Sequence, residues 1–435
     1  MNGRKGSSRD MNKLSRSLRT VLSRNKEFNS SKPPAYRIII QMKQGLSQAS
    51  LRELQQAAAP ETIRRVRHLP LIRAISAQAA ESCLLRLCAC DSVKRIYPDR
   101  LHRSSLYIAA PAIGSDTVRK KQGYTGKGIH IAVLDTGVYN HPDLTKPVNR
   151  IVGFKDFVNG RKLPYDDNGH GTHVAGDAAG NGWVSKGKYK GAAPEAGIVG
   201  VKVLDREGKG YDSTIIQGIQ WCMANRNKLK LRVLNLSLGS PALGPWSEDP
   251  MCQAVEKAVQ AGLVVTAAAG NSGPGRGSVE SPGISPSVIT VGAVDDRRTV
   301  TQADDVITVF SGRGPAKGGG VKPDLLAPGE TIISLRSPGS LLDRELPYQR
   351  VGRSYFTLSG TSMASPLVAG AAALLLQKQP GLSPQQVKEK LKRHAYSLGL
   401  DANTGGSGEV NVRFLIPGAR IRHRPRRTAR HAHRS

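Results

Sequence analysis

The chain has 435 residues, of which 39% are hydrophobic and 22% charged. This composition supports a buried core, excludes a wholly disordered chain, and leaves length for one large domain and a smaller one. The 47 Gly and 26 Pro residues follow no Gly-X-Y repeat, which excludes collagen and indicates a loop-rich α/β protein.

The net charge of +31 is concentrated at the two ends of the chain. Residues 1–32 and 33–105 each carry +7 and residues 411–435 carry +8, whereas the much longer stretch 106–410 carries only +9. Such flanks can attract anionic partners. They lack the interleaved aromatic residues that stack on bases, so no specific nucleic-acid partner is expected.

The N-terminal sequence is basic and polar and lacks the apolar segment of a secretory signal. The apolar stretch 367–376 is about half the length of a membrane span. We therefore expect a cytoplasmic protein without a membrane span, with secretion by a non-standard route left open. Five cysteines, an odd and sparse set, do not predict a disulfide framework. The sequence does not indicate an oligomeric state.

Residues 1–32 are expected to form a flexible basic segment, and the following residues a small domain. The apolar patterns predict, in chain order, a strand at 36–42, a helix at 47–58, a strand at 71–76, a helix at 79–90 and a strand at 93–97. This alternation predicts a compact α+β domain over residues 33–105.

After a joint at about residues 100–126, short apolar strands alternate with helices. Strands are predicted at 129–134, 198–204, 232–236, 263–268 and 288–291, and helices at 213–225, 249–261, 361–377 and 383–393. Apolar strands with crossover helices predict an α/β domain with a mostly parallel sheet covered on both faces, over residues 106–410. Residues 411–435 are expected to be a basic C-terminal tail.

Three polar motifs occur where these apolar elements begin or end. Asp135 ends the strand 129–134, His170 opens a helix of small residues, and Ser362 opens the helix 361–377. The carboxyl ends of parallel strands gather functional groups at one edge of a sheet. A serine hydroxyl needs a base within hydrogen-bond reach and a group that orients the base. The three residues therefore predict nucleophilic catalysis by serine.

Two further segments complete this predicted site. Asn271 follows the strand 263–268 and could donate a hydrogen bond to a developing oxyanion, beside the backbone N–H of Ser362. The segment 233–239 ends in a stretch that could act as an edge strand and pair with an extended peptide.

Five motifs in this order, DTGV, HGTHVAG, NLSLG, AAAGNSG and GTSMASP, resemble those of the subtilase family of serine endopeptidases, in particular its intracellular bacterial alkaline members. The resemblance covers roughly residues 110–400. It implies a subtilisin-like, doubly wound fold and peptide-bond hydrolysis through an acyl-enzyme. It also implies Asp135 as the orienting carboxylate, His170 as the general base and acid, Ser362 as the nucleophile and Asn271 as the oxyanion donor.

The resemblance further implies how substrates bind. Ser237, Leu238, Gly239 and Gly270 match the family's substrate-binding positions. The substrates would be proteins or peptides, and the chemistry would require no cofactor. The pocket walled by Leu238, Gly239 and the strand end at 267–270 is expected to accept a large apolar side chain before the scissile bond.

The same resemblance implies that residues 33–105 are a ferredoxin-like propeptide that acts as an intramolecular inhibitor. The chain would then be a zymogen that cleaves itself between about residues 98 and 111. Structural calcium is also possible, because Asp143 matches a carboxylate that family members use for calcium. The loop 181–190, which would form the rest of such a site, instead contains three lysines.

One alternative comes from a different functional class. A catalytically silent subtilase fold could bind nucleic acid or another anionic partner through its basic flanks. The predicted catalytic positions all contain residues competent for catalysis, which favours the enzyme.

Overall fold

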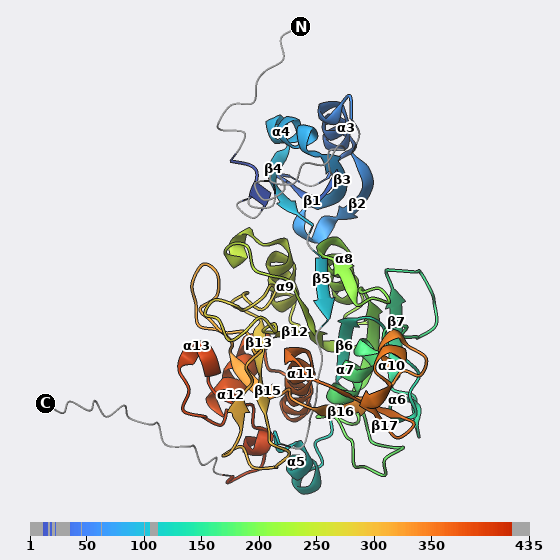
Figure 1. Cartoon of the computed structure of the whole chain (residues 1–435), viewed down its shortest axis with the longest axis vertical. Helices are drawn as coiled ribbons and strands as arrows, with labels where there is room; N and C mark the ends of the chain where they lie inside the picture. The colour runs from blue at the N-terminus through green and yellow to red at the C-terminus, as the bar shows by residue number, and fades with distance from the viewer. Residues whose placement is uncertain are drawn as a thin grey trace, which may run out of the picture.

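The computed structural model describes residues 12–15, 18, 19, 22, 35–44, 46–61, 63–99, 101–104 and 112–419, with the backbone alone at 101–104. In Figure 1 a small N-terminal domain is seated on one end of a larger α/β domain. Most of the segment 1–32 and the last sixteen residues of the expected basic tail lie outside the described residues.

The N-terminal domain is a four-stranded antiparallel sheet covered by two helices. Its elements are β1 (Ala35–Met42), α3 (Gln48–Ala58), β2 (Arg64–Leu69), β3 (Ala74–Ala80), α4 (Glu81–Ala89) and β4 (Val93–Pro98). The strands lie in the order β2-β3-β1-β4. Strands and helices in the sequence β-α-β-β-α-β are typical of ferredoxin-like domains.

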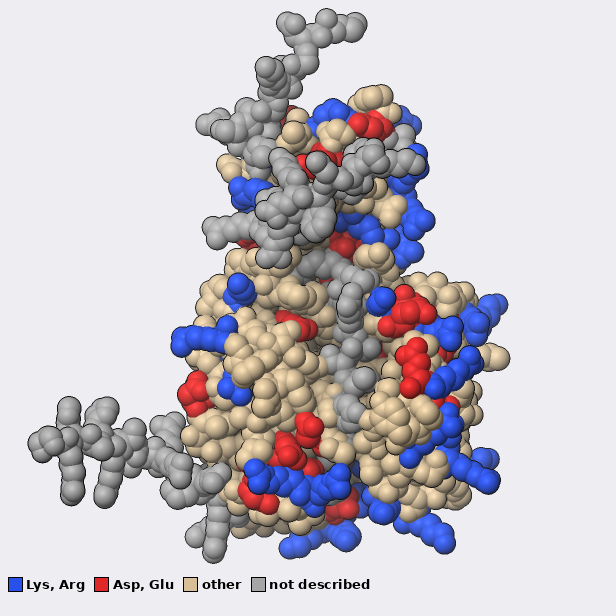
Figure 2. Space-filling view, in the orientation of Figure 1, with Lys and Arg blue, Asp and Glu red and all other residues tan. Residues whose placement is uncertain are grey.

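Strand β2 was not predicted, and β3 begins three residues later than predicted. The sequence of β2 is Arg-Arg-Val-Arg-His-Leu, and only its last residue is buried. An exposed edge strand of this kind has no apolar alternation that a sequence pattern can detect. Arg64, Arg65 and Arg67 are exposed on this strand, and Figure 2 shows blue side chains on the part of the N-terminal domain where Figure 1 draws β2.

The larger domain is built on an eight-stranded sheet. Its strands are β6 (His130–Asp135), β7 (Ile151–Asp156), β8 (Gly197–Lys202), β10 (Leu231–Leu236), β12 (Val264–Ala268), β13 (Ile289–Asp295), β14 (Val306–Ile307) and β15 (Leu325–Pro328). The order is β14-β13-β12-β10-β6-β8-β7, with β15 also paired to β13. Every pairing is parallel except that of β13 with β14.

Helices and two small sheets surround this sheet. The helices are α5 (Ser115–Gln122), α6 (Pro142–Thr145), α7 (His170–Ala179), α8 (Asp212–Ala224), α9 (Pro250–Gln260), α10 (Leu341–Glu345), α11 (Thr361–Lys378), α12 (Pro384–Arg393) and α13 (Ala402–Gly405). One small sheet contains β5 (Leu101–Ser104), β9 (Lys209–Tyr211) and β11 (Leu238–Gly239), and the other contains β16 (Ile332–Leu335), β17 (Arg350–Val351) and β18 (Tyr355–Leu358).

Both faces of the main sheet are buried, as the apolar strands predict. Along β6, Ile131 and Val133 pack in the core that contains α7 and α11, whereas Ala132 and Leu134 pack in the core that contains α8 and α9. The strands therefore alternate between two apolar layers rather than between core and solvent. This confirms the predicted doubly wound architecture.

The N-terminal domain packs on α8 and α9 through the outer face of its sheet. Ile39, Leu69 and Tyr97 belong to the same apolar core as those helices. At the edge of this contact, Gln253 of α9 accepts a hydrogen bond from Gln41 at 2.9 Å and donates one to the Tyr97 hydroxyl at 3.3 Å. The contact thus combines apolar packing with paired polar groups.

Asp99, which follows β4, caps helix α8 from outside the larger domain. Its two carboxylate oxygens accept hydrogen bonds from the backbone N–H and the hydroxyl of Ser213, at 2.9 and 2.8 Å. Tyr211, the residue preceding α8, provides no side-chain cap. The N-terminal domain therefore supplies the acceptor that the first turn of α8 otherwise lacks.

The compact domain extends further toward the C-terminus than expected. Val412 and Leu415 form part of a short 3-10 helix, and both side chains are buried in the main core. The backbone N–H of Val412 donates to the carbonyl of Ile113, which ties this segment to the start of the domain. The expected tail therefore begins after these residues rather than at 411.

All five cysteines are buried, and no disulfide joins them. Within the part of the chain that the structure describes, no helix is long and apolar enough to span a bilayer.

A pair of buried carboxyl groups lies between the sheet and the C-terminal segment. Glu409 is fully buried and Asp305 is 1% exposed. Burial raises the pKa of Asp305 to about 6, and burial together with the neighbouring Asp305 raises the pKa of Glu409 well above its ordinary value. Both carboxyl groups bind their protons more tightly in the folded state than in the unfolded chain. Their contribution to the free energy of unfolding is therefore complete below about pH 4 and decreases as the pH rises through 6.

Replacing Glu409 by glutamine should therefore stabilise the protein at pH 8 by about 1–3 kcal/mol, since a neutral amide needs neither a buried charge nor the uptake of a proton on folding. The gain should shrink toward pH 5, where the wild-type pair is protonated. Urea unfolding at both pH values, in a Ser362→Ala background that prevents self-digestion, measures this difference. The exposed Glu345 provides the control Glu345→Gln, which should change little. A destabilised Glu409→Gln variant at pH 8 would contradict the assignment.

Candidate active site

The centre of the site is an aspartate–histidine pair at the carboxyl edge of the main sheet. Asp135 is the last residue of β6, in the middle of the sheet, and His170 is the first residue of α7. The Nδ1 atom of His170 lies 2.7 Å from Oδ1 of Asp135, and both side chains are fully buried. A carboxylate at this position holds the proton on Nδ1, so that Nε2 can accept another proton.

The first turn of α7 is held close to β6 by its sequence. A Cβ atom at Gly171 would lie 2.2 Å from the carbonyl oxygen of Gly137, so only glycine permits this approach. Asp166 lies just before the helix, and its carboxylate accepts hydrogen bonds from the backbone N–H groups of Gly169 and Thr172, each at 2.8 Å. Asp166 thus caps the helix that carries the histidine, a role that the sequence motifs did not reveal.

Ser362 is the second residue of α11 and is 1% exposed. Its hydroxyl donates to the carbonyl oxygen of Ser237 at 3.0 Å, and the Ser237 hydroxyl donates to the carbonyl oxygen of Ser362 at 2.6 Å. Ser237 follows β10, whose register pairs Asn235 with Val133 of β6. Ser237 and Asp135 therefore end neighbouring strands, and Ser362 is bonded to that same edge of the sheet.

Asn271 follows β12 and is oriented by the residue before Ser362. Its side-chain oxygen accepts hydrogen bonds from the backbone N–H and the hydroxyl of Thr361, at 2.9 and 3.1 Å. Because the oxygen is engaged, the two N–H donors of the amide remain available for a ligand oxygen. The backbone N–H of Ser362 belongs to the first turn of α11, where N–H groups lack intrahelical acceptors. The two donor groups together can stabilise a negatively charged oxygen.

The predicted substrate strand is paired with an extended segment of the chain itself. Strand β5 lies antiparallel between β11 and β9, with Ser104 opposite Leu238 and Leu101 opposite Tyr211. Figure 1 shows β5 leaving the N-terminal domain and entering the larger domain. This is addition of an extended peptide strand to a free edge, the mode of binding expected for a peptide substrate.

The two predicted binding glycines, Gly239 and Gly270, both lie close to the side chain of Glu280. Gly239 ends β11, and Gly270 lies directly before Asn271 with a φ of +93°. The backbone N–H of Gly270 donates to the Thr361 hydroxyl at 3.1 Å.

A buried polar network beneath Ser362 was not predicted. The side-chain oxygen of Asn235 accepts hydrogen bonds from the hydroxyls of Thr266 and Ser365, at 2.9 and 2.8 Å, and its amide nitrogen donates to the Ser237 hydroxyl at 2.8 Å. These bonds connect β10, β12 and α11. The only sequence signal was a pair of polar residues, Asn235 and Thr266, at buried positions of otherwise apolar strands.

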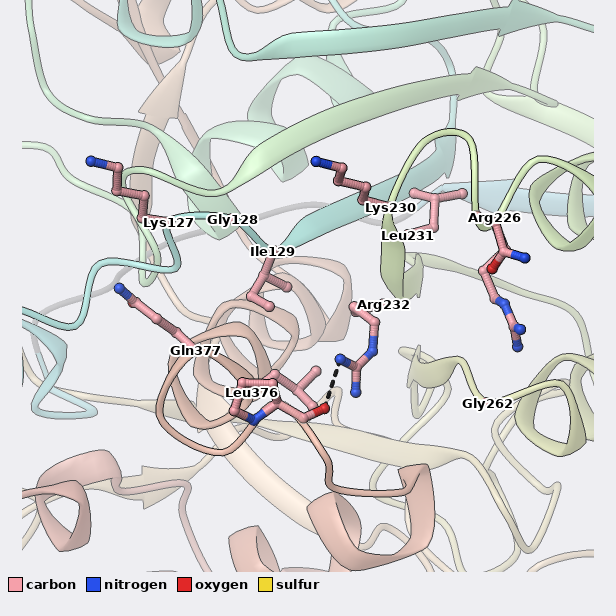
Figure 3. Close-up of a pocket in the computed structure, with 12 residues that line it drawn as sticks. Lys127, Gly128, Ile129, Arg226, Lys230, Leu231, Arg232, Gly262, Leu376 and Gln377 are labelled. Carbon is pink, nitrogen blue, oxygen red and sulfur yellow. Dashed lines mark hydrogen bonds between the residues drawn. The ribbon is translucent and has the colours of Figure 1, made fainter.

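A cavity of about 610 Å³ lies at the opposite edge of the sheet, where β6 and β10 begin. Figure 3 shows four cationic side chains around it, those of Lys127, Arg226, Lys230 and Arg232, together with a hydrogen bond from Arg232 to the carbonyl of Pro380. None of the predicted catalytic or substrate-binding residues lines this cavity. Cavity size therefore does not identify the active site here.

The surroundings of Asp143 do not fit a calcium site. Its carboxylate oxygens accept hydrogen bonds from the hydroxyl of Tyr355 at 2.7 Å and the backbone N–H of Val184 at 2.9 Å. Calcium requires six to eight oxygen ligands, whereas the partners here are donors, and Lys186 and Lys188 follow in the same loop. Among the residues with described positions, no group of three or more His, Cys, Asp or Glu side chains could hold a metal ion.

The chain is similar in sequence to known proteases. The sequence profile of the subtilase family matches residues 126–414. Serine protease AprX from Bacillus subtilis (strain 168) is 47% identical over 355 residues, which cover 80% of each chain. Subtilisin Savinase from Lederbergia lenta is 40% identical over 292 residues, covering 67% of this chain and 91% of the relative.

The fold is also found in a solved structure. Fervidolysin from Fervidobacterium pennivorans, described as a keratinolytic enzyme related to subtilisin, superposes with a TM-score of 0.69. The match covers 90% of this chain and 62% of fervidolysin at 23% identity, so it supports the fold alone.

Proposed function

The chain belongs to the subtilase family and is a serine endopeptidase, and we propose that Asp135, His170 and Ser362 are its catalytic triad. The observation that carries the assignment is the 2.7 Å contact between the buried Asp135 carboxylate and Nδ1 of His170, at the sheet edge to which Ser362 is bonded. No resident metal ion or cofactor is needed for this chemistry.

The geometry supports a two-step acyl transfer. The Ser362 hydroxyl attacks the peptide carbonyl carbon while Nε2 of His170 takes the hydroxyl proton, and Asp135 stabilises the resulting imidazolium. The tetrahedral intermediate then breaks the C–N bond, and the histidine returns the proton to the departing amine. Water attacks the acyl-enzyme by the same route and releases the acid.

Asn271 is proposed to donate to the oxyanion of the tetrahedral intermediates. Replacing it by alanine should lower kcat by about 10²–10³-fold with little change in KM, because the hydrogen bond forms mainly in the transition state. Steady-state kinetics on a peptide substrate, with circular dichroism to establish folding, measure the effect. A kcat within threefold of wild type, or a loss confined to KM, would contradict this role.

We propose that residues 33–105 are a propeptide that blocks the cleft until it is cut. Strand β5 takes the position of a substrate strand, and its register places Ser104 opposite Leu238, one residue from the carbonyl that Ser362 contacts. Strand β5 therefore runs toward the nucleophile up to Ser104, its last residue. Within the expected interval 98–111, this position favours cleavage in the stretch that follows residue 104, which lies outside the described part of the chain.

The contact between the two domains supports the same role. The Arg37 guanidinium lies 3.4 Å from the centre of the Tyr211 ring and 3.2 Å from the carboxylate of Asp99, the residue that caps α8. These contacts hold the end of β4 against the larger domain. The following strand, β5, can therefore pair with the edges of β9 and β11. Such preorganisation favours binding of the strand within the same chain.

Terminal sequencing and intact mass measurement test self-processing. Wild-type protein should begin between residues 105 and 112, whereas Ser362→Ala should retain its original N-terminus. The same N-terminus in both proteins would contradict processing by Ser362. Mixing active wild type with Ser362→Ala distinguishes cleavage within one molecule from cleavage between molecules.

Casein hydrolysis that is blocked by phenylmethylsulfonyl fluoride tests the endopeptidase activity itself. The alternative, a silent fold that binds an anionic partner through its basic flanks, is not favoured by the similarity to proteases. Salt-dependent DNA binding without any casein hydrolysis would reverse that preference. The expected cytoplasmic location remains a prediction.

A further inference from the structure

Glu280 lies beside the two predicted substrate-binding glycines, Gly239 and Gly270. The backbone N–H of Glu280 donates to the carbonyl of Ala269 at 2.9 Å, next to the end of β12. Ser281 and Ser240 exchange two backbone hydrogen bonds of 2.9 and 3.1 Å, just after β11. The segment 279–281 therefore crosses from one wall of the predicted pocket to the other.

The carboxylate of Glu280 lies between the two segments that end in Gly239 and Gly270. A Cβ atom at Gly239 would be 2.4 Å from Oε2 of Glu280, and one at Gly270 would be 2.4 Å from its Cδ. Because neither glycine has a side chain, the carboxylate lies directly against the backbone at both positions. The hydroxyl of Ser272 donates to Oε1 at 2.8 Å, which helps to hold the group in place.

This pocket differs from the apolar pocket expected from the sequence. A large apolar side chain entering it would have to displace the carboxylate or remove it from water, and both are costly. A lysine or arginine side chain can instead run between the glycine walls and place its charge at the carboxylate, forming a charge-assisted hydrogen bond. The position of an acid in the pocket of a serine protease is known to set such a preference.

We propose that Glu280 is a specificity-determining residue that makes the enzyme cleave after lysine or arginine. This inference rests on the proposed catalytic role of Ser362, since the pocket lies beside that nucleophile. It replaces the expectation of an apolar preference. The substrates would then be proteins or peptides with exposed basic residues.

Matched peptide anilides that differ only in the residue before the scissile bond, Lys, Arg, Phe or Leu, provide the test. Full-length protein, allowed to process itself, should give kcat/KM for Lys or Arg at least about tenfold above that for Phe. Glu280→Gln should lower kcat/KM for the basic substrates about tenfold or more and leave Phe unchanged or improved. Glu345→Gln, an exposed acid in α10, is the charge-matched control and should preserve the preference.

The outcomes separate this inference from the function on which it depends. A wild-type preference for Phe or Leu, or an equal loss on all substrates in Glu280→Gln, would overturn the role of Glu280 while leaving the peptidase intact. Hydrolysis of none of the substrates would instead overturn the peptidase proposal and this inference with it. A basic preference that weakens in 1 M salt would support a charge interaction, because salt screens it.

Discussion

Replacing Ser362 by alanine is expected to lower kcat for peptide hydrolysis by about 10⁶-fold, as loss of the nucleophile does in subtilisin. The hydroxyl is positioned at the first turn of α11, where it is buried and bonded to the carbonyl of Ser237. Water would have to attack the substrate without an acyl-enzyme in the variant. The remaining activity would come from the oxyanion donors and from substrate binding alone.

The matched control for this variant is Ser359→Ala, three residues earlier in the same motif. The Ser359 hydroxyl accepts a long hydrogen bond from the backbone N–H of Thr331, 3.4 Å away, and is not bonded to the site. Its removal should change kcat by less than about threefold. Retention of more than a thousandth of the activity in Ser362→Ala, or an equal loss in Ser359→Ala, would contradict the assignment of the nucleophile.

Asp135→Asn is expected to lower kcat by about 10⁴-fold without unfolding the protein. The wild-type carboxylate accepts hydrogen bonds from both the Thr136 backbone N–H and Nδ1 of His170, each at 2.7 Å. An asparagine can direct its N–H₂ group toward Nδ1, which moves the ring proton to Nε2. The histidine then offers a donor where Ser362 needs an acceptor, so the serine is no longer activated.

A second aspartate–histidine pair in the same helix gives the control. Nδ1 of His173 lies 2.9 Å from Asp177, and its Nε2 bonds the backbone carbonyls of Ile332 and Phe356. Asp177→Asn removes a buried carboxylate without touching the nucleophile. It should alter stability and leave kcat of the folded protein within about tenfold. Comparable losses of kcat in the two variants would contradict a specific role for Asp135.

The sequence patterns placed the proposed catalytic residues at the ends of elements, and the structure has Asp135 and Ser362 at those element ends. Asp135 ends an apolar strand, and Ser362 opens a long helix of small residues, so topology alone places them at one sheet edge. The resemblance to a known family added Asn271 and the substrate strand. The two-layered burial of β6 and its neighbours likewise follows from strands without polar alternation.

The features that escaped prediction depend on contacts between distant segments. Asp166 caps α7 and Asn235 connects three elements, but each is an ordinary polar residue in the sequence. Glu280 is ten residues from Gly270 in the sequence, and only the crossing of its segment between two walls brings its carboxylate to Gly239 and Gly270. Patterns along the chain carry no information about such approaches.

Covalent labelling tests the central claim, the activation of Ser362, most directly. A fluorophosphonate probe reacts with a serine only where a neighbouring base activates it, and peptide mass spectrometry locates the adduct. Processed wild-type protein should carry one adduct on Ser362, and the labelling rate should fall by orders of magnitude in Asp135→Asn. Unlabelled Ser362 in folded, processed protein, or an adduct on another serine at the same rate, would contradict the account.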